Sequence, residues 1–117
     1  MDIELMNKIS SLHGPSGNET KVKKFMKENL QNADEILEDR MGGVFGVYKG
    51  TEEGPKIMIC AHMDEIGFMI IGVDENGLLR FNNLGGIDSK VIFGKRIKIN
   101  DVYGVIGGAP VHLLDGD

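Results

Sequence analysis

The sequence has a single cysteine and lacks long apolar runs. Because Cys60 has no second cysteine to pair with, a disulfide within the chain is excluded. No apolar stretch approaches the ~20 residues that a membrane helix needs. The start of the chain also lacks the basic, then apolar, then small-residue pattern of a secretory signal. These features predict a cytoplasmic protein that does not bind membranes.

Positive charge is also scarce, with 13 Lys and Arg against 18 Asp and Glu, for a net charge of -5. Binding to nucleic acid requires clustered cations that neutralise phosphates. The one basic cluster, over Lys21–Lys27, lies on an expected helix, where a solvated face explains it. We therefore expect no nucleic-acid partner.

Helical spacing is confined to the beginning of the chain. Asp2 can cap a helix whose apolar side is Ile3, Met6 and Ile9, and Gly14–Pro15 would end it. Ser16 and Glu19 have the spacing of a capping box, which predicts that a second helix starts near Ser16. The expected buried side of that helix is Val22, Phe25, Met26 and Leu30.

Short strands are expected from residue 35 onward. The run Lys56–Ala61 (KIMICA) is almost wholly apolar, which is typical of a strand covered on both faces of an α/β sheet. Asn100–Asp101 is a candidate for a two-residue hairpin turn. Glycine is abundant, at 17 of 117 residues, and most of it follows residue 42, which favours many tight turns. The other expected strands are Glu35–Glu38, Val44–Tyr48, Ile66–Val73, Leu78–Phe81, Arg96–Ile99 and Val102–Ile106.

The pattern changes near residue 66, from helices and strands to short strands and glycines. We therefore predict an α/β portion over residues 1–66 and part of a small β-barrel over residues 67–117, inserted without a Pro- or Ser-rich linker.

His62 and Asp64 are the candidate functional residues. They directly follow the apolar run, and in α/β sheets ligands and metals bind beyond the carboxyl ends of strands. In extended chain, side chains two residues apart point to the same side. A carboxylate there can accept one ring N–H of the histidine and leave the other nitrogen for a metal. By spacing alone, a metal site and an incidental His-x-Asp pair both remain open.

Several segments of this sequence, taken in chain order, resemble the glutamyl-aminopeptidase and tetrahedral (TET) aminopeptidase family. The specific one is Ala61–Met69 (AHMDEIGFM); the glycine-containing segments support it. The sequence departs from the family at Gly43, where the family often has Asn. The absence of the Asn side chain affects one hydrogen bond within this loop. The supporting segments are Gly14–Glu19 (GPSGNE), Asp39–Val44, Gly85–Asp88 and Gly104–Gly107.

The resemblance implies a metal-dependent peptidase that removes N-terminal residues from peptides. Its fold would be a zinc-peptidase-like α/β catalytic domain, with an inserted PDZ-like β-barrel that mediates homo-oligomerisation. Its cofactors would be two divalent ions, zinc or cobalt. The family's metal-binding His carries over onto His62, and the catalytic-site Asp that supports it carries over onto Asp64. The general-base Glu and the other ligands have no matching motif here, so the chain is expected to be an N-terminal portion with an incomplete site and uncertain activity alone.

Two other functions were weighed. Relatives have carried endoglucanase labels, but a glycosidase needs two carboxylates across a sugar. The chain could also act only as an association module. Four other residues or pairs are expected to have structural or solvent-facing roles: Glu52–Glu53 in a solvated turn, His13 at a helix end, His112 in a loop, and Cys60 as a small buried hydrophobe.

Overall fold

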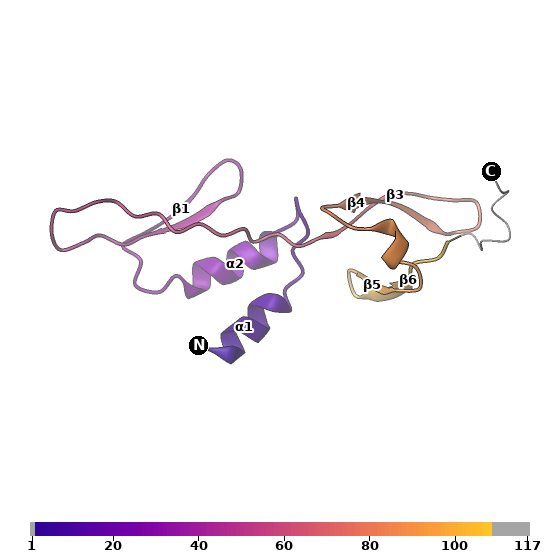
Figure 1. Ribbon diagram of the computed structural model, residues 1–117, viewed down its shortest axis with the longest axis horizontal. Coiled ribbons are helices and arrows are strands. Elements are labelled where there is room, and N and C mark those ends of the chain that lie inside the picture. Colours follow the sequence, from indigo (N-terminus) through magenta and orange to yellow (C-terminus); the bar gives the residue numbers. More distant parts are fainter. Residues whose placement is uncertain (1, 109–117) are drawn as a thin grey trace. The chain divides into compact units, whose positions relative to one another are not determined.

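The computed structural model describes residues 2–108, and the chain divides into two compact units between Gly85 and Gly86. The predicted domain boundary after residue 66 stays a prediction. The first unit contains α1 (Ile3–Ser10), α2 (Thr20–Asn29), β1 (Glu35–Glu38), β2 (Val44–Val47), β3 (Gly67–Val73) and β4 (Leu79–Leu84); the second contains the short 3₁₀ helix η1 (Ser89–Val91), β5 (Arg96–Ile99) and β6 (Val102–Val105) (Figure 1).

Helix α1 begins as the sequence predicts. The Asp2 carboxylate accepts the backbone N–H of Leu5 at 3.0 Å and so satisfies one of the free donors at the helix start. The helix ends at Ser10, one turn before Gly14–Pro15. Among the described residues, no helix is both long and apolar enough to cross a membrane.

The predicted capping box of the second helix is wrong. Helix α2 begins at Thr20 rather than near Ser16. The Ser16 hydroxyl donates to the Asp64 carboxylate, and the Glu19 carboxylate accepts the N–H of Gly17 at 2.6 Å. A tertiary partner has therefore taken the hydroxyl that local spacing assigned to the helix.

Helix α2 lies along the β1–β2 hairpin (Figure 1). Lys27 donates to the Glu38 carboxylate on β1, and Lys23 lies 3.6 Å from the same group. Val22 on the same helix is 4% exposed and is the buried hydrophobic side chain among the described residues of the first unit.

The hairpin predicted at Asn100–Asp101 forms, and two further hairpins accompany it. Strands β1 and β2, β3 and β4, and β5 and β6 pair antiparallel in three two-stranded sheets across the described residues. Asn100 and Asp101 connect β5 to β6, and Asn100 has a positive φ of 51°, as tight hairpin turns require. Local turn chemistry therefore predicted the β5–β6 hairpin correctly.

The predicted strand over Lys56–Ala61 is wrong. Within the described residues this run pairs with no strand, and Ile57, Met58 and Ile59 are 83, 76 and 93% exposed. A strand needs a neighbour to bond its N–H and C=O groups, and hydrophobic patterning alone supplies none. Cys60, expected to be buried in this strand, is exposed for the same reason.

Candidate metal centre

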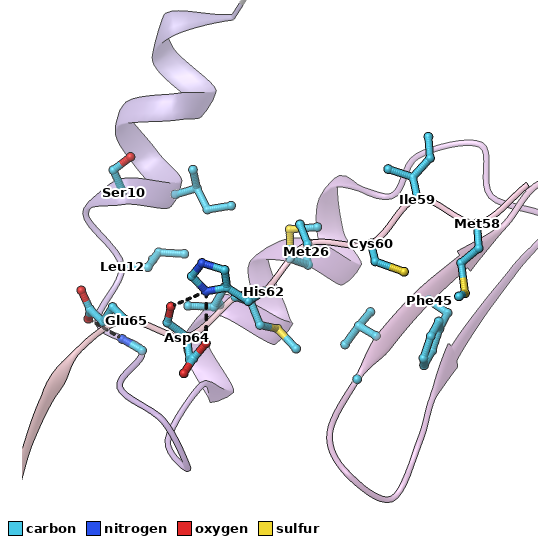
Figure 2. A pocket seen from close by; sticks show the side chains of 17 residues that line it. Ser10, Leu12, Met26, Phe45, Met58, Ile59, Cys60, His62, Asp64 and Glu65 are labelled. Carbon is cyan, nitrogen blue, oxygen red and sulfur yellow. Dashed lines mark hydrogen bonds and ion pairs between the residues drawn. The ribbon is translucent and has the colours of Figure 1, made fainter. Parts of the chain in front are cut away.

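The segment that follows the exposed apolar run borders a pocket of about 480 Å³ in the first unit. Figure 2 shows the side chains that line it, which come from α1, α2, β2 and residues 58–65. The pocket is apolar along the Met26 and Phe45 side and polar where His62 and Asp64 meet it.

His62 and Asp64 are brought together as predicted. Nδ1 of His62 lies 3.0 Å from the backbone oxygen of Asp64 and 3.1 Å from its carboxylate Oδ1 (Figure 2). Both atoms are acceptors, so Nδ1 is the N–H donor of this contact, and in the neutral ring the lone pair then lies on Nε2. The imidazole is 85% exposed. The neutral ring in this orientation therefore has a free acceptor at Nε2.

The Asp64 carboxylate is held on its other oxygen as well. Oδ2 accepts the hydroxyl of Ser16. The pKa of Asp64 is below its usual value, mainly because of this hydrogen bond; partial desolvation opposes the shift, and the hydrogen bond from His62 lowers the pKa further. The carboxylate is therefore ionised at neutral pH and acts only as an acceptor.

Glu65 ties the same segment to the loop after α1. Its carboxylate accepts the N–H of Gly14 at 2.8 Å, and its own N–H donates to the Gly14 oxygen at 3.0 Å. His13, which the sequence places at a helix end, lies 3.6 Å from the Glu65 carboxylate. This arrangement gives His13 a charged neighbour outside the His62–Asp64 pair.

The side chains at this site can supply one ligand to a metal centre. His62 offers an imidazole nitrogen that is already oriented by a carboxylate, the usual arrangement for a metal-binding histidine. Across residues 2–108, no three His, Cys, Asp or Glu side chains gather to hold an ion. Among these residues, His62 and Asp64 thus form an imidazole oriented by a carboxylate, and their role at a metal stays a prediction.

Glu52 and Glu53 do not line the pocket. Glu52–Glu53 lies in an exposed bend, as predicted, and His112 lies outside the described residues. Sequence reasoning missed Ser16 as a partner of Asp64, because the two residues are 48 positions apart and Ser16 had a plausible local role as a helix cap.

The chain is similar to known aminopeptidases over almost its whole length. A family model described as M42 glutamyl aminopeptidase matches residues 42–117. The lysyl aminopeptidase of Pyrococcus furiosus is 36% identical over 119 residues, which cover 97% of this chain and 34% of that protein. The glutamyl aminopeptidase of Lactococcus lactis subsp. cremoris is 36% identical over 125 residues, which cover 97% of this chain and 35% of that protein. The chain spans about a third of the length of these curated relatives.

Solved structures agree on the fold. A TET aminopeptidase from Thaumarchaeota archaeon SCGC AB-539-E09 matches 96% of this chain and 32% of its own, with a TM-score of 0.85 and 37% identity. A Thermotoga maritima protein named endoglucanase matches 86% of this chain and 32% of its own, with a TM-score of 0.79 and 32% identity. PhTET1-12s, described as a dodecamer in the asymmetric unit, matches 97% of this chain and 35% of its own, with a TM-score of 0.76 and 31% identity. The chain therefore has the peptidase-like α/β fold of the TET aminopeptidases.

Proposed function

Because this chain belongs to the M42 glutamyl aminopeptidase family, we propose that the whole protein is a metal-dependent aminopeptidase that removes N-terminal residues from peptides. The observation that carries the proposal is the His62–Asp64 pair, with Nδ1 bonded to Asp64 and Nε2 bearing the lone pair beside a pocket. Such a pair is pre-organised to hold a divalent cation.

The two residues have different roles in this proposal. His62 ligates one of two divalent ions, zinc or cobalt, through Nε2. Asp64 accepts the Nδ1 proton, which selects the ligating tautomer and makes the ring a better donor. When bound, the ions would polarise the scissile carbonyl. They would also lower the pKa of a water molecule bound to them, so that hydroxide would be available at neutral pH. Asp64 is suited to its role because Ser16 holds its second oxygen.

The domain assignment follows the family. Residues 1–66 form the N-terminal part of the catalytic domain, and residues 67–117 form part of the inserted β-barrel through which the protein, located in the cytoplasm, assembles as a homo-oligomer. The hairpins β3–β4 and β5–β6 both lie after residue 66, which supports the division, whereas the chain divides into its two compact units between Gly85 and Gly86. The homo-oligomer is supported by the similar protein PhTET1-12s, which is described as a dodecamer.

An activity test separates this function from glycoside hydrolysis, which the name of the Thermotoga maritima neighbour raises. The full-length protein is expected to release p-nitroaniline from an aminoacyl-p-nitroanilide, and to lose that activity to a chelator and recover it with zinc or cobalt. A glycosidase instead relies on two carboxyl groups across the bond. Hydrolysis of cellulose oligomers with no release from the anilide would contradict the proposal.

Asp64→Asn is expected to weaken zinc binding and turnover by roughly 10–100-fold, the usual cost of losing an orienting carboxylate. The amide removes the negative charge that favours a donor at Nδ1, but it keeps a similar shape. The measurement is zinc affinity by chelator competition together with kcat on the anilide. Asp101→Asn is the matched control, because Asp101 is fully exposed and lies near Lys98 rather than the pocket. Equal losses in both variants would rule out a specific role for Asp64.

A further inference from the structure

We infer that Ser16 is a positioning residue for the His62–Asp64 pair. Its hydroxyl fixes the Asp64 carboxylate, which in turn fixes the His62 imidazole. Metal binding by the imidazole rests on the proposed function. The hydrogen-bonded link from Ser16 through Asp64 to His62 is independent of that function.

The first step of the argument is the use of both Asp64 oxygens. Oδ2 accepts from Ser16, and Oδ1 accepts from His62 at 3.1 Å. A carboxylate bonded through one oxygen can still turn about its terminal torsion, which is a soft one. A second donor from another part of the chain removes that freedom. Ser16 is therefore placed to set the plane of the carboxylate that meets Nδ1.

The second step is that the serine is itself held firmly. Gly14 and Glu65 exchange two hydrogen bonds, of 2.8 and 3.0 Å, and Pro15 pairs with Glu65 in an isolated parallel bridge. Gly14 and Pro15 are buried. The residues on both sides of the Ser16–Asp64 bond thus lie in one hydrogen-bonded unit, and the hydroxyl does not depend on a free loop for its position.

Glycines allow the two segments to approach this closely. A Cβ at Gly67 would lie 2.8 Å from the Pro15 Cβ, and one at Gly14 would lie 2.5 Å from Val22 Cγ2. Both distances are below any normal contact between carbon atoms. The segment before α2 is therefore packed between the helix and the strand that follows His62.

The turn around Ser16 is also specified. Asn18 N–H donates to the Pro15 oxygen at 2.8 Å, and Gly17 has a φ of 86°, as the third position of a type II turn requires. The Glu19 carboxylate accepts the Gly17 N–H at 2.6 Å. Ser16 is the second residue of this turn, and its exposed side chain leaves room for a slightly larger hydroxyl residue.

The experiment compares Ser16→Ala, Ser16→Thr and Ser11→Ala in the full-length protein. Ser16→Thr keeps the hydroxyl. Ser11→Ala is the matched control, because it removes a nearby hydroxyl that bonds only the Asn7 oxygen of its own helix end. Two quantities are measured: the NMR signal and solvent exchange of the His62 Nδ1 proton in metal-free protein, and zinc affinity by chelator competition.

We expect the His62 Nδ1 proton of the wild type to be protected from exchange. In Ser16→Ala it should shift and exchange faster, and zinc should bind about tenfold more weakly, near the lower end of losses for orienting groups. Ser16→Thr and Ser11→Ala should match the wild type in both measurements. A purely structural role would lower thermal stability without singling out the Nδ1 proton.

Three results would overturn the inference: an unprotected Nδ1 proton in the wild type, an unchanged signal and zinc affinity in Ser16→Ala, or equal losses in Ser16→Ala and Ser16→Thr. The wild-type measurement can overturn the inference even if a variant does not fold. Failure of the proposed function looks different. In that case His62→Ala would leave zinc binding unaltered, while Ser16→Ala would still shift the Nδ1 proton.

Discussion

His62→Ala is expected to remove one metal ion per subunit and nearly all peptidase activity from the full-length protein. A histidine nitrogen binds zinc at ~2.0–2.1 Å, and a methyl group offers no donor in its place. The loss should therefore exceed the roughly 10–100-fold expected for Asp64→Asn.

Elemental analysis of purified protein and kcat/KM on an aminoacyl-p-nitroanilide measure these two effects. His13→Ala is the control, since His13 lies beside Glu65 and outside the His62–Asp64 pair. If His62→Ala kept two metals per subunit and wild-type rates, the assignment of His62 as a ligand would be wrong.

The second large effect concerns association of the 117-residue chain by itself. We expect it to sediment as a dimer or larger at micromolar concentration. Ile57 and Ile59 are 83 and 93% exposed, in a run whose backbone has no strand partner within the described residues. Each isoleucine removed from water contributes roughly 1.5–3 kcal/mol, and an unpaired extended segment readily adds to another strand.

The double variant Ile57→Lys, Ile59→Lys is expected to return this chain to a monomer, because two charges oppose strand pairing and apolar contact. Glu53→Lys, in the exposed bend just before the run, is the control and should stay associated. Sedimentation velocity over a dilution series measures the change. A wild-type chain that remained a monomer on dilution and melted cooperatively would show that these residues close their own core. Association without any catalysis in the full-length protein would instead favour the association-module alternative.

Much of the local structure could be predicted because its causes lie within a few residues. The Asp2 cap of α1 and the Asn100–Asp101 turn depend on neighbours in the chain. The His62–Asp64 pair has the same origin, since residues two apart in an extended segment share a side. The resemblance carried by residues 61–69 then turned an ambiguous pair into a metal-site prediction, and the family match supports the same peptidase assignment.

What only the tertiary structure decided involves partners that are distant in sequence. Ser16 and Glu19 satisfy a rule for helix caps, but Ser16 bonds Asp64 and Glu19 bonds Gly17. Hydrophobic patterning over Lys56–Ala61 predicts burial, but burial and strand pairing depend on a neighbour that sequence periodicity does not specify. The sequence by itself determined that His62 and Asp64 form a hydrogen-bonded pair. The approach of the Gly14–Ser16 segment decided how firmly they are held, because a hydrogen bond across 48 residues exists only after the chain has folded.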